Sequence, residues 1–321
     1  MKIKSVLLIF LYILGGYTIL SAQSFRVACW NVENYFDIYN DSLTNDDSFT
    51  PQGDHRWTAY RFAHKRNSIY KTIVALAGDS FNYPSIIGLA EVENAHVLRE
   101  LCFNTPLRRI GYNYIHYDSP DLRGIDCALL YLPSRFEPIY SQRIDVSDST
   151  RNFYTRDILL VAGLMDRTDT CYCLVNHFPS KLGGGEADLN RVKVAQKLKY
   201  ILDTIQFHHP TAVILAMGDF NADPTEEVFT NVFQFKEGLN SNGFYDLVSS
   251  IPIGQGTYKY HDTWSCIDHI ISNRLVPIHI FSPDFLLLPD KKYLGNKINR
   301  TYIYIRYQGG ISDHLPIYID L

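Results

Sequence analysis

The sequence has no surplus of basic residues. Its 30 lysine and arginine residues are outnumbered by 34 aspartate and glutamate residues, which gives a formal net charge of −4. A protein that binds nucleic acid mainly by neutralising phosphates usually carries the opposite charge. The acidity therefore argues against a tight, non-specific nucleic-acid binder. It is compatible with an enzyme whose bound divalent metal supplies local positive charge.

A hydrophobic run long enough to span a bilayer is also missing. The apolar stretch Val6 to Leu20 follows Lys2 and Lys4 and precedes Ala22. This order predicts a secretory signal peptide over residues 1–22, cleaved after Ala22. A membrane anchor is the alternative, but the stretch is short for a span and no basic flank follows it.

The predicted cleavage has consequences for location and charge. We expect export to the periplasm or the extracellular space, with no stable membrane insertion once the signal peptide is removed. The mature chain keeps 28 basic and 34 acidic residues, so its formal net charge becomes −6. No internal repeat, low-complexity tract or Pro/Gly/Ser-rich linker divides the remainder. The sequence therefore predicts one catalytic domain over residues 24–321, and we expect a monomer.

Cysteine and histidine do not group with the spacing of a zinc site. Export permits disulfides, but six cysteines allow about fifteen pairings, so the connectivity stays open. Most of the cysteines lie in apolar strand-like runs, where a free thiol behaves as a small hydrophobe. The six cysteines are Cys29, Cys102, Cys127, Cys171, Cys173 and Cys266.

Short apolar runs with β-branched or aromatic residues dominate the chain and predict strands. They cover residues 25–31, 85–90, 112–117, 126–132, 138–145, 157–165, 170–176, 211–217, 266–272, 277–282, 301–307 and 315–320. Helical patterns are fewer, at 58–78, 94–103 and 186–207, and the last has a broad apolar stripe. Two packed sheets with helices outside fit this count.

Polar side chains follow several of these runs at the point where each run ends. Such groups can converge on one rim of a sheet, where sites are commonly built. The segments that carry them begin at Trp30, Glu91, Asn176 and Gly218. A fifth run, around Trp264 to Ile271, carries Asp268 inside the predicted strand, and Ser312-Asp313-His314 directly precedes the last apolar run. Stability alone gives little reason to place an acid beside a histidine there, because burying either group unpaired costs several kcal/mol.

These segments, in this order, resemble the endonuclease/exonuclease/phosphatase superfamily. The resemblance covers residues 25–321 and rests on Asn31, Glu91, Asn176-His177, Asp219-Phe220-Asn221, Asp268-His269 and Ser312-Asp313-His314. The opening Trp30 to Phe36 is similar to secreted bacterial nuclease-like members. The resemblance implies a four-layer α/β/β/α sandwich of two mainly antiparallel sheets with helices outside.

The resemblance also implies a metal centre. Glu91 and Asp313 would be the principal metal carboxylates, with Asn31 completing or approaching that shell. Asp219 would orient the attacking water or hold a second metal. Hard oxygen ligands of this kind suit Mg²⁺ or Mn²⁺ rather than zinc.

Catalytic roles follow from the same resemblance. His314 matches the catalytic histidine, Asp268 the carboxylate that holds its ring, and Asn221 a donor to a phosphoryl oxygen. His177 matches a second histidine near the leaving group, with a structural strand-end histidine as the alternative.

Two further positions are assigned from the same resemblance. Arg156 matches an arginine aimed at the phosphate, with a solvated strand-edge charge as the alternative. Asp126 falls near the acid that supports the second histidine. We interpret Glu33, Glu93, Asp223 and His269 as solvated residues or supporting neighbours.

The resulting prediction is a secreted metal-dependent hydrolase of phosphate esters, most simply a phosphodiesterase or endonuclease acting by in-line attack of water. The alternatives are a small-molecule or lipid-headgroup phosphodiesterase or phosphatase, similar to sphingomyelinases, and a non-catalytic binding protein on the same scaffold. Nucleic acid remains among the candidate substrates. The acidic, aromatic segment Asp37 to Asn67 is expected either to overhang the site or to form a surface loop. The glycine run at 183–185 is expected to be a flexible turn.

Overall fold

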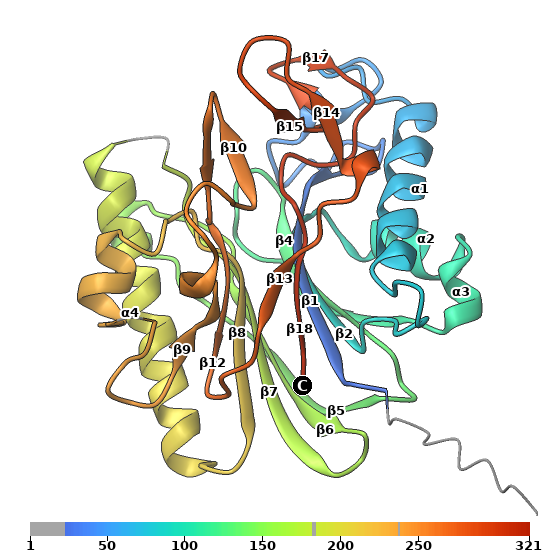
Figure 1. Ribbon diagram of the computed structural model, residues 1–321. Coiled ribbons are helices and arrows are strands. Elements are labelled where there is room, and N and C mark those ends of the chain that lie inside the picture. The colour runs from blue at the N-terminus through green and yellow to red at the C-terminus, as the bar shows by residue number, and fades with distance from the viewer. Residues whose placement is uncertain (1–22, 182–183, 237) are drawn as a thin grey trace, which may run out of the picture.

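The computed structural model describes residues 23–181, 184–236 and 238–321 (Figure 1). The predicted signal peptide at 1–22 and part of the glycine run at 183–185 lie outside these residues. Within the described ranges, no helix combines the length and apolar character needed to cross a membrane.

The first sheet has six strands in the order β13-β18-β1-β2-β4-β3. Their bounds are β1 Arg26–Tyr35, β2 Ile86–Val92, β3 Asn113–His116, β4 Asp126–Tyr131, β13 Ile278–Ile280 and β18 Ile317–Asp320. Only β1 and β2 pair in parallel. The carboxyl ends of these two central strands therefore meet at the same edge of the sheet.

The second sheet repeats this plan in the order β5-β6-β7-β8-β12-β9. Its strands are β5 Phe136–Ile144, β6 Ile158–Met165, β7 Asp169–His177, β8 Val213–Asp219, β9 Tyr245–Asp246 and β12 Asp268–Ser272. Here β7 and β8 form the one parallel pair, and the others are antiparallel. Both sheets are thus mainly antiparallel, as predicted.

Alternating side chains place each sheet between two apolar layers. On β1, Val27 and Cys29 face the core between the sheets, whereas Ala28 and Trp30 face the outer core under the helices. Helices α1 Ala59–Ala75, α2 Ala95–Phe103 and α3 Leu107–Ile110 cover the first sheet, and α4 Gly185–His208 covers the second (Figure 1). The predicted four-layer α/β/β/α sandwich is confirmed.

Local sequence signals explain where the main helices begin. The Thr58 side chain accepts a hydrogen bond from the Arg61 N–H, and Asn94 accepts from His96 and Val97, so α1 and α2 have side-chain N-caps. In α4 the predicted stripe is the buried face, with Val194, Leu198 and Leu202 against the second sheet.

Small hairpins and turns complete the fold. The hairpins are β10 Tyr258–Tyr260 with β11 Thr263–Ser265, β14 Leu287–Pro289 with β15 Asn296–Ile298, and β16 Tyr302–Ile303 with β17 Arg306–Tyr307. The short helical turns are η1 Asp47–Phe49, η2 Ser149–Arg151, η3 Val228–Val232, η4 Leu247–Ser250 and η5 Asp284–Leu286. The prediction of a single strand at 301–307 is therefore wrong, because the chain reverses direction at Tyr304, whose φ is 54°. These hairpins stand above one end of the two sheets (Figure 1).

All six cysteines are buried free thiols. Cys171 and Cys173 point to the same face of β7, with their sulfur atoms 3.5 Å apart. They pack in the core between the sheets, so they act as small apolar side chains.

Candidate active site

The predicted site residues converge because of the two parallel strand pairs. Asn31 lies on β1 and Glu91 at the end of β2, while His177 and Asp219 are directly paired at the ends of β7 and β8. Antiparallel β12 begins opposite this end, which pairs Asp268 with Asp219. The segment Ser312-Asp313-His314 leads into β18, which runs antiparallel to β1. The ends of both sheets therefore meet at one site.

Irregular backbone shapes the first sheet at this site. The pairing of β1 with β2 shifts between Asn31 and Tyr35, and that of β2 with β4 shifts between Ala90 and Val92. Glu33, Asn34 and Glu91 have φ values of 53°, 54° and 64°, and Asn221 on the other sheet has 47°. Bulges and left-handed residues cluster next to active sites because they redirect side chains. Here they turn Glu91 toward the second sheet.

His314 and Asp268 form a buried pair. The ring Nδ1 of His314 lies 2.7 Å from Asp268 Oδ2. The backbone around His314 is also fixed, because the Trp30 indole donates to its carbonyl and its own N–H donates to Ser312 Oγ. Burial alone would lower the pKa of His314, but Asp268 and Asp219 outweigh it and raise that pKa well above its usual value. This arrangement is that of a histidine held by a carboxylate for proton transfer.

Asn31 organises the neighbouring carboxylates. Its amide nitrogen donates to Glu91 Oε1 at 3.3 Å and to Asp219 Oδ2 at 3.0 Å. Its oxygen accepts the Glu33 N–H at 2.9 Å, which fixes the amide orientation. The nitrogen rather than the oxygen thus faces the carboxylates, which differs from the expected role of Asn31 as a metal ligand.

The charges of the site fit a cation. Burial, with a contribution from Asp268, raises the pKa of Asp219 to about 7, which indicates that its negative charge is poorly compensated. Ligand atoms of Asp219, Asp268 and His314 lie within 4.8 Å of one another. This group shares only Asp219 with the predicted ligands, which are Asn31, Glu91, Asp313 and Asp219. The available donors are mainly carboxylate oxygens, which suit Mg²⁺ or Mn²⁺.

His177 lies between the two carboxylates that Asn31 bridges. Its Nε2 is 3.6 Å from Asp219 Oδ2 and 4.0 Å from Glu91 Oε1. Burial and the positive charges of Arg156 and Arg123 lower its pKa well below the usual value, so the ring is neutral. Its Nδ1 is buried and has no hydrogen-bond partner among the described residues. A histidine with a purely structural role would normally have that partner.

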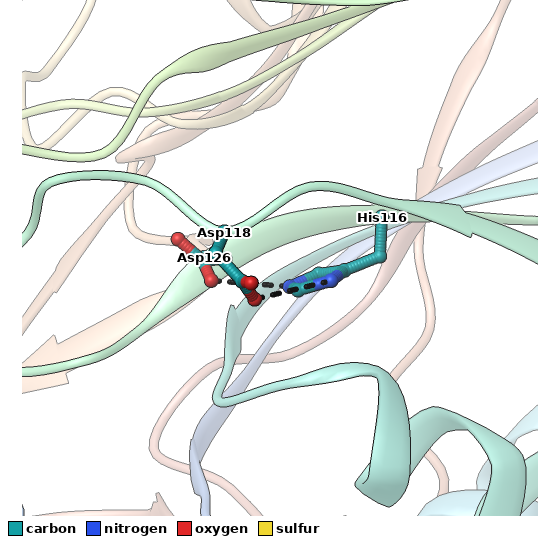
Figure 2. A group of neighbouring side chains, drawn as sticks. All are labelled: His116, Asp118 and Asp126. Carbon is teal, nitrogen blue, oxygen red and sulfur yellow. Dashed lines mark hydrogen bonds and ion pairs between the residues drawn. The ribbon is translucent and has the colours of Figure 1, made fainter. Parts of the chain in front are cut away.

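Asp126 does not support His177. Figure 2 shows Asp126 beside His116, whose Nε2 lies 3.1 Å from Asp126 Oδ2. The β3–β4 register pairs His116 with Ala128, which places His116 and Asp126 on the same face. Asp118, at 3.9 Å from His116 Nδ1, is largely exposed. Asp126 thus hydrogen-bonds to a residue of its own sheet, and the expectation that it supports His177 is wrong.

Arg156 also forms its hydrogen bonds with groups other than the site carboxylates. Its guanidinium donates to Asp121 Oδ2 at 3.0 Å and to the Phe178 carbonyl at 2.7 Å, and the side chain is buried. The Asn221 amide donates to the same carbonyl at 3.0 Å. Arg156 is therefore neither a solvated edge charge nor free to face a phosphate. It joins the loop before β4 to the end of β7.

Sequence reasoning missed two arginines that stand closer to the carboxylates. Arg123 Nη2 lies 3.9 Å from Glu91 Oε2, and Arg300 Nη2 donates to Asp313 Oδ2 at 2.8 Å. The signal for Arg123 was present as a turn pattern, Asp121-Leu122-Arg123-Gly124. For Arg300 no local pattern marks the position, because its side chain contacts Asp313 and Glu33, which are distant in the sequence.

The residues interpreted as solvated or supporting neighbours are mostly buried supports. Glu33 accepts the Thr301 and Tyr302 N–H groups, and Glu93 accepts the Asp37 N–H at 2.5 Å. The His269 ring lies 2.9 Å from Asp246 and contacts the Ala222 carbonyl. They hold the loops around the site.

Known proteins share this sequence pattern and fold. A curated relative, nocturnin of Rattus norvegicus, is 28% identical over 193 residues, which are 56% of this chain and 41% of the relative. The chain thus spans about two fifths of the length of that relative. Two solved structures share the fold: TDP2 of D. rerio complexed with single-strand DNA product (TM-score 0.55, 16% identity, covering 92% of this chain and 98% of that one) and a mannosyl-6-phosphatase of Bacteroides thetaiotaomicron (TM-score 0.54, 17% identity, covering 92% and 98%). Residues 26–321 match the Endonuclease/Exonuclease/phosphatase family, and the chain belongs to that family.

Proposed function

We propose that this chain is an exported, divalent-metal-dependent phosphodiesterase that hydrolyses its substrate by in-line attack of water. One observation carries the proposal: the His314–Asp268 pair and the carboxylates of Glu91, Asp219 and Asp313 meet at the ends of two facing sheets. Cleavage of phosphate esters requires this combination of proton transfer and charge neutralisation.

Each residue has a task that its contacts support. Glu91, Asp219 and Asp313 would hold Mg²⁺ or Mn²⁺, which when bound neutralises charge on the phosphate. Asn31 keeps Glu91 and Asp219 apart in fixed positions through its amide. His314, held by Asp268, transfers a proton during cleavage. Neutral His177 can donate from Nε2 near the leaving group, and the second N–H of the Asn221 amide is available for a phosphoryl oxygen.

Export is supported by the sequence. Lys2 and Lys4, the apolar Val6 to Leu20 stretch and Ala22 have the order of a cleavable signal. The mature domain would then act in the periplasm or outside the cell, and we propose that it does so as a monomer.

The substitution Glu91→Gln tests the metal requirement. It removes a charge but keeps the size and the acceptor for the Asn34 N–H, so the fold should remain while turnover is abolished. Initial rates with Mg²⁺ would be measured on duplex DNA, RNA, sphingomyelin, bis-p-nitrophenyl phosphate and sugar phosphates. Mn²⁺ binding would be measured by calorimetry.

Exposed Glu137 on β5 provides a matched control, and Glu137→Gln should keep full activity and metal affinity. If Glu91→Gln, or chelator-treated wild type, hydrolysed the true substrate at the normal rate, the proposal would be wrong.

A small-molecule phosphodiesterase or phosphatase is the second candidate. Residues 37–57 are rich in aspartate and pack beside the site, where Asp37 contacts Glu93 and Asn45 contacts Leu122. With the net acidic charge, this segment disfavours long polyanions. The fold that the chain shares with a mannosyl-6-phosphatase is compatible with this candidate. The substrate panel distinguishes the two.

A further inference from the structure

Two arginines face the carboxylates of the site and have no role in the proposed chemistry. Among the described residues, Arg123 and Arg300 are the arginines that an ion pair joins to Glu91 or Asp313. Their side chains are 48% and 37% exposed, so both keep N–H donors accessible. Arg156, which the sequence favoured for a phosphate, is 7% exposed and already paired with Asp121.

Arg123 lies in a loop that several hydrogen bonds hold in place. The Arg123 N–H donates to Asp121 Oδ1, and the other carboxylate oxygen of Asp121 accepts from Arg156. Gly124 follows with φ 69°, and a Cβ there would lie 2.9 Å from Thr44, so the turn requires glycine. The Asn45 N–H donates to the Leu122 carbonyl, and the Ser119 N–H to Asp126. The side chain of Arg123 then donates to Asn34 Oδ1 at 2.8 Å, which aims it at the site.

Arg300 is presented by a buried polar network. The adjacent Thr301 N–H donates to Glu33 Oε2 at 2.6 Å, and the Thr301 hydroxyl accepts from Lys65 Nζ, also at 2.6 Å. Glu33 and Lys65 are both buried. Burying two such charges is expensive and adds little net stability. Their position under residues 300–302 indicates that they hold the backbone from which Arg300 reaches Asp313.

The two guanidinium groups approach from opposite sides. In the first sheet the order is β18-β1-β2, so Glu91 on β2 and Asp313 before β18 flank Asn31 on β1. Arg123 reaches Glu91 and Arg300 reaches Asp313. An anion bound over this centre would thus have one planar, multidentate donor on each side. A guanidinium matches the geometry of phosphate oxygens.

We propose that Arg123 and Arg300 form a clamp for the substrate's phosphate and bind its non-bridging oxygens from opposite sides. This inference deepens the proposed function and rests on it for the identity of the site. The ligand class is a phosphate group, whether terminal or in a diester. In this clamp the arginines take the position that Arg156 cannot occupy.

Calorimetric titration with inorganic phosphate tests the clamp without turnover. The Mn²⁺-loaded protein would be compared with Arg123→Ala and Arg300→Ala, each expected to weaken the phosphate Kd roughly tenfold or more, since charge-assisted hydrogen bonds are lost. Arg123→Lys and Arg300→Lys should lose less, because they keep the charge but not the fork. They also keep the test valid if an alanine variant fails to fold.

Arg135→Ala is the matched control. Arg135 is also paired with an aspartate, Asp166, and contacts the Gln23 carbonyl, which precedes the start of β1, whereas the site lies toward the other end of that strand. It should bind phosphate as the wild type does. Unchanged affinity in both Arg123→Ala and Arg300→Ala, or no phosphate binding by the wild type, would overturn the clamp. A different outcome is that the wild type binds phosphate but hydrolyses no ester, while these variants lose phosphate binding. That outcome would support the clamp and contradict the proposed function alone.

Discussion

At the scale of single residues, the behaviour of His314 depends on its neighbours. Asp268 accepts from its Nδ1, and this leaves Nε2 facing Asp219 at 3.8 Å and Asp313 at 3.9 Å. One ring nitrogen is therefore used for orientation and the other points to the reacting centre. Asp268 Oδ1 has no partner among the described residues, so the carboxylate is committed to the histidine.

This pairing predicts a specific pattern of kinetic losses. His314→Ala should lower kcat roughly 100- to 10,000-fold, because proton transfer is removed. Asp268→Asn should lose less, since asparagine still holds the ring but cannot stabilise its charged form. The double variant should be close to His314→Ala, because the two residues act as a unit. Thermal unfolding would confirm that each variant is folded. Losses that multiply in the double variant would give Asp268 a separate, structural role.

Residue identity could be read from the sequence where chemistry and chain order coincide. Four site residues lie together because each stands beside the end of a strand, and the ends of apolar runs mark these places in the sequence. They are Asp219, Asp268, Asp313 and His314. The partners of Arg156 and Asp126 could not be read. Asp121 and His116 are near them in space through strand register and loop geometry, which no local pattern encodes.

At the scale of elements, the long buried strands and the three main helices were predictable, because apolar runs and a 3.6-residue stripe mark them. The hairpins were not. At 301–307, residues with strand propensity form β16 and β17 around Tyr304, and the pairing is set by contacts of Tyr302 with Glu33 and His55. Tertiary contacts override local propensity in such short segments.

The buried lysine of α1 shows how a helix supports the site. Lys65 donates to Thr301 and to the Ile311 carbonyl. Burial lowers its pKa to about 8, while Glu33 and Asp313 act in the opposite direction. Lys65→Met keeps the apolar stem but removes a buried positive charge near Glu33, which keeps the Arg300 guanidinium, with Nε at 4.0 Å. The free energy of unfolding, measured by urea denaturation, should fall by about 2 to 4 kcal/mol, because Thr301 and the Ile311 carbonyl lose a charged donor.

Two comparisons make this prediction specific. Lys71 lies exposed on the same helix, and Lys71→Met should change stability by less than about 0.5 kcal/mol. Adding Glu33→Gln to Lys65→Met should recover part of the loss, because it removes a buried carboxylate charge that has less positive charge near it once Lys65 is replaced. Equal stability of Lys65→Met and Lys71→Met would show that Lys65 does not support the segment.

At the scale of the whole molecule, function depends on charge as well as on geometry. The two sheets bring the site residues together, and we expect the segment 37–57 and the hairpin β16–β17 to influence what can approach them. Phe36, Trp57, Ile125 and Tyr302 form a small core that joins this segment to the loop of Arg123 and to the hairpin. Within the segment Asp37 to Asn67, α1 begins at Ala59, close to the predicted helix start at 58.

The acidic segment gives the final prediction. Asp46 is buried and accepts the Asp41 N–H, so replacing it would damage the loop. Asp41 and Asp47 are exposed, and Asp41→Asn with Asp47→Asn removes only their charge. Activity on duplex DNA should rise several-fold at low salt, where screening is weakest. Activity on bis-p-nitrophenyl phosphate should barely change, because it presents one charge.

Exposed Asp79 and Asp169 lie near the opposite strand ends, so Asp79→Asn with Asp169→Asn controls for net charge. An equal rise in both double variants would assign the effect to net charge, and no rise in either would make the segment irrelevant to substrate choice.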